Sequence, residues 1–176
     1  MVTGEEYRLD KDSMGEVKVP ASSYYGAETQ RAFQNFPISG LRLPKEFIRA
    51  MALIKLSAAR ANMQLKLLDA KKGEAIVSAA KEIMEGSLYD QFVVDVFQTG
   101  SGTSTNMNMN EVVANRANEL LGGKKGDRTM IHPNNDVNMC QSTNDVFPSA
   151  IHVSSAEQIA RKLIPSLRVL AEALEK

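Results

Sequence analysis

Apolar side chains recur at helical spacing over most of the chain. Between residues 45 and 68 they follow one another at alternating intervals of four and three positions: Phe47, Met51, Ile54, Ala58, Ala61, Leu65 and Leu68. These intervals place the side chains along one face of an α-helix. The spacing therefore predicts a long amphipathic helix whose buried face is this stripe.

Three further helices are predicted from similar signals. Asp69 is a favourable N-cap for a second helix, and Gly86 would end it. A third helix is predicted over residues 103–121, where two glycines follow. A fourth runs from Asn144 to Lys176, with a kink predicted at Pro165. The chain is therefore expected to be mainly α-helical, and it contains no internal repeat.

The first 44 residues differ from the rest. Residues 5–9 and 16–19 alternate polar and apolar side chains around Gly15, which predicts a small hairpin or extended arm. The prolines and glycines that follow predict a segment that wraps over the helices. We therefore divide the chain into residues 1–141 and residues 142–176. The first part holds an extended arm (1–44), helices (about 45–121) and a polar loop (122–141), and the second begins a long helix.

The last predicted helix stays amphipathic to its end. Leu167, Leu170, Ala171 and Leu174 continue its apolar stripe, yet no later element follows to cover them. A long helix with an uncovered apolar stripe needs a partner. Either the chain oligomerises through this helix, or it is a piece of something longer.

Composition excludes several classes of protein. The chain has 176 residues, with 21 basic and 21 acidic side chains, and 43% of its residues are hydrophobic, as in globular proteins. A formal net charge of zero without basic runs argues against a nucleic-acid partner. No apolar run approaches the roughly 18 residues of a membrane span, and the charged N-terminus is unlike a signal peptide. A cytoplasmic protein is therefore expected. The single cysteine, Cys140, is expected to be a small buried thiol.

The first polar segment that is a candidate for chemistry is TGSGTSTNMNMN, at residues 99–110. Ten of its twelve residues are Gly, Ser, Thr or Asn, and it opens the third predicted helix. A helix N-terminus with neighbouring hydroxyls suits an anion. Because the Gly-Lys-Ser/Thr ending of a phosphate-binding loop is missing, a carboxylate is the better ligand. The simpler interpretation is a capped, flexible loop.

The second polar segment is HPNNDVNMCQSTND, at residues 132–145, and it opens the fourth predicted helix. Capping alone would need one Ser, Thr, Asn or Asp, and this segment is much richer in polar residues. Two such helix starts in one domain indicate donors that face a single dianion. His132 is either a structural histidine or part of a second small anion site.

These segments resemble motifs of the class II fumarases, in the fumarase/aspartase superfamily. The matching runs are VFQTGSGTSTNMN at 96–108 with NEVVAN at 110–115, and HPNNDVN at 132–138 with QSTNDVFP at 141–148. GEVKVP at 15–20, YYGAETQ at 24–30 and NFPI at 35–38 also match. The resemblance covers nearly the whole chain and implies the helical N-terminal lyase domain of this superfamily, with residues 142–176 opening the central helix bundle.

Within the superfamily two activities compete. The TGSG run, His132 and the FPSAIH run at 147–152 favour a fumarase, whereas CQSTND at 140–145 is closer to aspartases. The resemblance therefore implies a fumarate hydratase of the tricarboxylic acid cycle, which interconverts fumarate and L-malate. Aspartate ammonia-lyase is the alternative, and a non-catalytic dicarboxylate-binding or assembly module is the third.

The resemblance also implies roles for particular residues. Ser101, Gly102 and Thr103 match positions that bind a substrate carboxylate, and so do Ser142, Thr143 and Asn144. His132, Pro133, Asn134 and Asn135 match a secondary dicarboxylate site. Two departures from the family pattern weaken that second site, because Asn135 stands where Asp is frequent and Thr129 stands where the family has Arg.

The remaining expectations also follow from the resemblance. The family needs no metal or organic cofactor, its partners are fumarate and L-malate, and it assembles as a homotetramer. The family's catalytic base and acid lie further along the chain than residue 176, so no catalytic residue is expected here. This sequence is therefore expected to be an N-terminal fragment that is inactive by itself.

Overall fold

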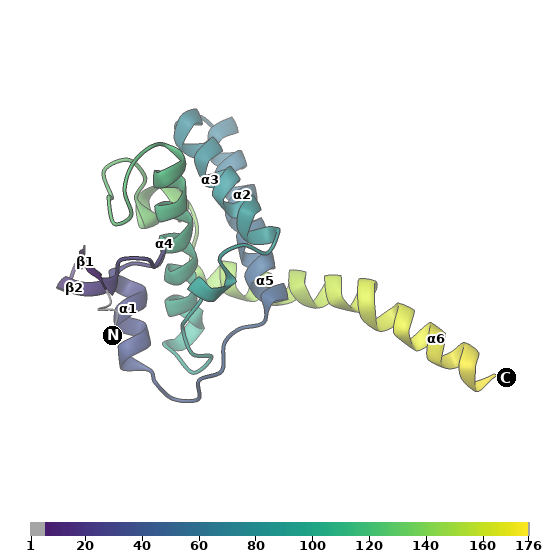
Figure 1. Ribbon diagram of the computed structural model, residues 1–176. Coiled ribbons are helices and arrows are strands. Elements are labelled where there is room, and N and C mark those ends of the chain that lie inside the picture. The colour runs from purple at the N-terminus through teal and green to yellow at the C-terminus, as the bar shows by residue number, and fades with distance from the viewer. Residues whose placement is uncertain (1–5, 176) are drawn as a thin grey trace.

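A computed structural model of the chain describes residues 6–175. Helices α2 (Lys45–Gln64), α3 (Ala70–Met84) and α4 (Thr103–Leu120) pack together as the body of the molecule (Figure 1). Helix α5 (Thr143–Gln158) packs against α2 and the start of α4, and the N-terminal hairpin lies with α1 (Ala27–Asn35) at the side of α4. The fold is mainly α-helical, as the sequence predicts.

The predicted hairpin is confirmed. Strands β1 (Tyr7–Asp12) and β2 (Gly15–Pro20) pair antiparallel, with Asp12 opposite Gly15 across a two-residue turn. Glu5, which we expected in the first strand, lies outside the described residues. Helix α1 corrects the expectation of an extended segment up to residue 44. Its N-terminus is stabilised from far along the chain, because the Glu111 carboxylate accepts hydrogen bonds from three backbone N–H groups there.

The predicted buried face of α2 is right in part. Phe47, Met51 and Leu68 of the stripe are buried, whereas Ala61 and Leu65 are exposed. The buried face also includes residues that the stripe left out: Ile48, Ala52, Lys55, Leu56, Ala59 and Asn62. Two of these, Lys55 and Asn62, are polar. Both donate hydrogen bonds to groups in the loop before α5. A hydrophobic pattern places such residues on the solvent face, so it missed this part of the buried face and extended the stripe to Ala61 and Leu65 instead.

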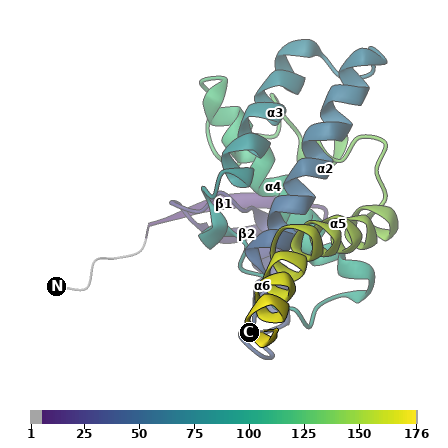
Figure 2. The ribbon, with the colours of Figure 1, turned by 90° about the vertical axis from the view of Figure 1, so that its right-hand side faces the viewer.

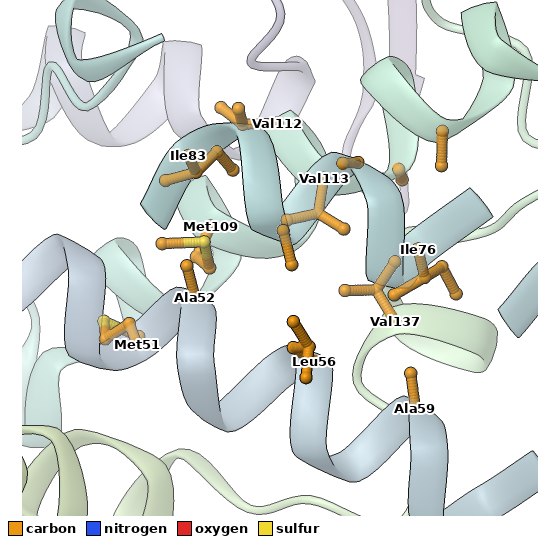
Figure 3. Close-up of a cluster of buried hydrophobic side chains, with 14 of the residues drawn as sticks. Met51, Ala52, Leu56, Ala59, Ile76, Ile83, Met109, Val112, Val113 and Val137 are labelled. Carbon is orange, nitrogen blue, oxygen red and sulfur yellow. The ribbon is translucent and has the colours of Figure 1, made fainter. Parts of the chain in front are cut away.

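The core lies where α2, α3 and α4 meet, as Figure 3 shows. Met51, Ala52 and Leu56 from α2 face residues of the other two helices there. The other labelled contributors are Ala59, Ile76, Ile83, Met109, Val112, Val113 and Val137. Alanines on α2 allow the helices to approach closely, so the apolar side of α4 is fully covered.

The C-terminal helix leaves the body, as Figures 1 and 2 show. A π-helical turn (Ile159–Leu163) joins α5 to α6 (Ile164–Leu174), and the Ile164 N–H bonds back five residues to the Ile159 carbonyl. Because Pro165 has no N–H for the Arg161 carbonyl, the regular ladder is interrupted at the position where a kink was predicted. Lys176, the predicted last residue of this helix, lies outside the described residues.

The apolar stripe of α6 is uncovered, as the sequence predicts. No residue between Ile159 and Leu174 is buried, and Leu167, Leu170 and Leu174 are each more than half exposed. Among the helices that the structure describes, none is long and apolar enough to cross a membrane.

Candidate functional site

The first polar segment forms a tight turn that leads into α4. Ser101 and Gly102 both have left-handed backbone conformations, with φ of 63° and 72°, and α4 begins at Thr103. The Thr99 and Ser104 hydroxyls are 2.9 Å apart, and the Gln98 side chain accepts from the Thr105 N–H at 2.9 Å. These bonds fix the turn and use the inner hydroxyls. The exposed Ser101 and Thr103 stand at the helix start.

In the second polar segment, three consecutive residues at the start of α5 (Thr143–Gln158) have different contacts. Ser142 is the N-cap of α5, and its hydroxyl oxygen accepts from the Asn144 N–H at 3.3 Å. Capping therefore accounts for Ser142. The Thr143 hydroxyl oxygen accepts from the Asn106 amide at 2.9 Å. Asn144 is exposed in the first turn, where the free N–H groups of α5 lie.

The structure brings the starts of α4 and α5 into contact. Phe147, in the second turn of α5, lies against Gly102, and a β-carbon on that glycine would overlap its ring. Asn106, one turn into α4, reaches Thr143. Two helix N-termini, each carrying a positive dipole end and hydroxyl side chains, therefore lie side by side.

A buried lysine lies behind this pair of helix starts. Lys55 has no solvent exposure, and its ammonium nitrogen donates to Asn138 Oδ1 at 2.9 Å and to Gln141 Oε1 at 3.0 Å. Burial lowers the pKa of Lys55 to about 7, because its partners are neutral amides and the charged form loses its hydration.

Asn106 and Asn138 extend this buried polar cluster to α5. Asn138 Oδ1 also accepts from Asn106 Nδ2 at 3.1 Å, while Asn138 Nδ2 donates to the Gln141 carbonyl. Asn106 Oδ1 is buried and has no partner within the described part of the chain. Sequence reasoning missed Lys55, Asn106 and Asn138 as parts of the site. The available signal was a lysine in an otherwise apolar helix stretch.

His132 caps a short π-helical turn (Pro133–Val137). Its Nδ1 accepts from the backbone N–H groups of Asn134 at 3.1 Å and Asn135 at 3.3 Å. Pro133 is buried, whereas the side chains of both asparagines are exposed. Burial is the main cause that lowers the pKa of His132, and the positive charge of Arg128 lowers it further. The histidine thus has a structural role, and its Nε2 remains for other contacts.

The arginine nearest to this turn faces the interior. Arg128 Nη2 lies 3.4 Å from Glu111 and 3.7 Å from Asp10, both of which are buried. The Thr129 hydroxyl donates to Asp127 at 2.6 Å. Arg128 Nη2 is thus directed at these buried carboxylates, and the Thr129 hydroxyl proton is used by Asp127.

An open hollow of about 380 Å³ lies between the hairpin turn, α1 and the start of α4. Thr99, Ser104 and Asn134 line it, so it borders both polar segments. Its charged groups are Asp12, Glu28 and Arg31, and Arg31 is already paired with Asp12 at 2.7 Å. Because acidic groups outnumber basic ones, this hollow is poorly suited to a dianion.

Cys140 corrects another expectation. It is exposed and has a left-handed backbone conformation, with φ of 58°, in the turn before α5. A cysteine placed by the apolar preference of its side chain would be buried, but this turn is held instead by neighbouring amides. Gln141 Nε2 donates to the carbonyls of Val137 and Met139, which directs position 140 outward.

This helical domain, with two hydroxyl-rich helix N-termini in contact, matches a family model described as "Lyase" over residues 15–176. The chain belongs to this lyase family, and its resemblance to class II fumarases is confirmed. It is 54% identical over 171 residues to the fumarate hydratase class II of Halobacterium salinarum, covering 97% of this chain and 36% of that protein. It is 52% identical over 169 residues to the corresponding protein of Ralstonia nicotianae, covering 96% and 37%.

Solved structures agree with the fold. A class II fumarase from Schistosoma mansoni superposes with a TM-score of 0.89 at 41% identity, covering 93% of this chain and 34% of that chain. A protein described as fumarate lyase:delta crystallin from Brucella melitensis gives 0.83 at 50% identity, covering 85% and 35%. The chain thus spans little more than a third of the length of the curated relatives it matches.

Proposed function

We propose that this chain supplies the substrate-carboxylate site of a fumarate hydratase, which adds water to fumarate to form L-malate. The contact between the starts of α4 and α5 carries the proposal. Ser101, Gly102 and Thr103 begin one helix, and Thr143 and Asn144 lie in the first turn of the other. Relatives at half identity or more are named fumarate hydratase class II, which supports the same activity.

The chemistry explains why neutral donors suit this site. Removing the proton next to a carboxylate of malate builds negative charge on that carboxylate in the transition state. Fixed N–H and hydroxyl donors stabilise this growing charge without having to reorganise. In the proposed reaction a base takes this proton, and an acid assists the departure of hydroxide as water. We propose that both groups come from outside residues 1–176.

Assembly is part of the proposal. The uncovered stripe of α6 ends in Leu167, Leu170 and Leu174, and we infer that it packs in a helix bundle of a homotetramer. A site made of helix starts then gains further groups from neighbouring subunits. The compartment is expected to be cytoplasmic, although one relative, from Rhizopus oryzae, is named as mitochondrial.

A weaker secondary dicarboxylate site is proposed at the π-helical turn. His132, Asn134 and Asn135 would offer Nε2 and amide donors there, and Pro133 would shape the turn. Arg128 is held inward through Nη2, 3.4 Å from Glu111, so part of its guanidinium is already engaged by a buried carboxylate. Its affinity for a dicarboxylate is therefore expected to be lower than that of the primary site.

The activity is tested with the complete natural protein that carries this sequence, incubated separately with L-malate and with L-aspartate. We expect fumarate, detected by its ultraviolet absorbance, from malate alone. Fumarate from aspartate alone would show that CQSTND at 140–145 is the better guide, and identify an aspartate ammonia-lyase. No fumarate from either substrate would favour a binding or assembly module.

The site is tested by two threonine substitutions on α4. Thr103→Ala is expected to lower kcat/KM at least roughly tenfold with little change in melting temperature, because it removes an exposed donor. Thr105→Val is the matched control, since Thr105 is buried and bonded to Gln98 at 2.7 Å. It should lower the melting temperature and leave the kinetics nearly unchanged. The opposite pattern would show that position 103 serves only to cap the helix.

A further inference from the structure

A continuous row of hydrogen bonds joins the core face of α2 to the start of α5. Lys55 Nζ donates to Asn138 Oδ1 at 2.9 Å, and the same oxygen accepts from Asn106 Nδ2 at 3.1 Å. Asn106 Nδ2 also donates to the Thr143 hydroxyl oxygen at 2.9 Å. Lys55 and Asn106 are 0% and 1% exposed, so solvent does not compete for these bonds.

The lysine fixes the direction of the bonds in this row together with the Gln141 carbonyl, which accepts from Asn138 Nδ2 at 3.1 Å. An ammonium group has donors only, so Asn138 must turn its carbonyl oxygen toward Lys55. That oxygen then requires a donor from Asn106, which must present its amide nitrogen. A neutral lysine amine still has two N–H bonds, which suffice for Asn138 and Gln141. The direction is therefore the same in both protonation states.

The consequence falls on Thr143. Its oxygen already accepts from Asn106, so its hydroxyl proton remains to be donated. Thr143 is the first residue of α5, where free N–H groups and the positive dipole end favour a carboxylate. Without the lysine, the bond from Asn138 Nδ2 to the Gln141 carbonyl at 3.1 Å is left to resist a reversal of the two amides. In the reversed arrangement Asn106 would accept from Thr143, and the hydroxyl would turn an acceptor oxygen toward a negative ligand.

We propose that Lys55 is a positioning residue that acts through Asn138 and Asn106 to hold the Thr143 hydroxyl as a donor to the substrate carboxylate. This inference rests on the proposed function. Lys55 itself is enclosed in the protein and does not reach the ligand. Its effect on the ligand passes only through Thr143.

A double-mutant cycle in the complete natural protein tests this route. Lys55→Met and Thr143→Val are each expected to raise KM for L-malate roughly tenfold, the effect of losing one hydrogen bond to a charged group. The double variant should have the KM of Thr143→Val alone, because Lys55 acts through that residue. If KM of the double variant rises by the product of the two single-variant factors, the inference is overturned.

Asn62→Leu is the matched control. Asn62 lies on the same face of α2, is buried, and donates to the Met139 carbonyl at 3.1 Å in the same loop, but it has no bond to the row that ends at Thr143. It should lower the melting temperature as Lys55→Met does and leave KM unchanged. An equal rise in KM would show that any damage to the loop suffices, and would overturn the inference.

Two further outcomes complete the design. If Lys55→Met does not fold, Asn138→Leu breaks the row at a half-buried loop residue, and its KM should rise to the same extent; an unchanged KM would overturn the inference. A wild-type protein that does not hydrate fumarate would overturn the proposed function together with this inference. An active wild type with independent effects of Lys55 and Thr143 would overturn the inference alone.

Discussion

The ring of Phe147 lies against Gly102 and occupies the space that any side chain at position 102 would need. Gly102 also has a φ of 72°, a conformation that residues with a β-carbon adopt at a cost of about 1 kcal/mol. This contact sets how closely the start of α5 approaches the start of α4. The geometry of the proposed carboxylate site therefore depends on a residue with no functional group.

Gly102→Ala should lower the free energy of unfolding by about 2–4 kcal/mol, from the left-handed backbone plus the overlap with Phe147. Gly122→Ala is the matched control, since Gly122 has a φ of 84° and nothing within 4 Å of an added β-carbon. It should lose only about 1 kcal/mol. Urea unfolding of the two variants measures the difference. Equal losses would mean that the ring moves aside freely.

The free energy of unfolding should rise with pH above neutrality because of Lys55. Its pKa is about 7 in the folded chain and 10.5 ordinarily, so between these values the unfolded chain binds more protons. The sign is therefore positive, and the total gain is at most about 5 kcal/mol. Lys55→Met should abolish this part of the rise, as shown by urea unfolding at pH 7 and pH 9.5. Parallel pH profiles for the variant and the wild type would contradict a lowered lysine pKa.

The Glu111 carboxylate should be needed for α1 to form. It is 1% exposed and accepts from the N–H groups of Gly26 at 2.9 Å and of Glu28 and Thr29 at 3.0 Å. Glu111→Gln should cost about 2–3 kcal/mol, because the amide nitrogen cannot accept from these donors. The rate of amide hydrogen exchange at residues 26–29 should rise by the factor that corresponds to this loss of free energy.

Glu119→Gln is a control for general loss of a negative charge on α4. Glu119 is partly exposed, where it bonds Arg116 at 3.0 Å and the Tyr24 hydroxyl at 2.6 Å. Its substitution should cost less than about 1 kcal/mol and leave exchange in α1 unchanged. Faster exchange in α1 for Glu119→Gln alone would contradict the role assigned to Glu111.

His132 should make the protein less stable as the solution is acidified. Burial lowers its pKa below the ordinary 6.5, so the unfolded chain binds more protons in the window that begins near pH 6.5 and extends down to the lowered value. His132→Asn should remove this dependence and keep the cap, because an amide oxygen also accepts from N–H groups at a helix start. Thermal unfolding between pH 5 and pH 7.5 is the measurement. A midpoint at or above 6.5 in a proton NMR titration of His132 would contradict the prediction.

Local sequence determined much of the helical architecture. The apolar spacing and the capping signals at Asp69, Gly86 and Gly122 are properties of neighbouring residues, so they mark helices α2, α3 and α4 without knowledge of the fold. The Asp69 side chain does accept from the Lys72 N–H at 3.1 Å. The hydroxyl-rich runs at 99–110 and 132–145 were visible for the same reason.

Tertiary contacts decided what local patterns could not carry. Helix α1 depends on Glu111, which lies 85 residues from Gly26 along the chain. The buried face of α2 includes Lys55 because amides 83 and 86 positions away satisfy it. Likewise, only the fold places Phe147 against Gly102 and Asn106 against Thr143. The sequence alone thus determined the other helices and the polar segments. The orientation of α2, the existence of α1 and the contact between two helix starts were decided by the tertiary structure. The physical reason is that groups distant in sequence had to satisfy buried polar atoms.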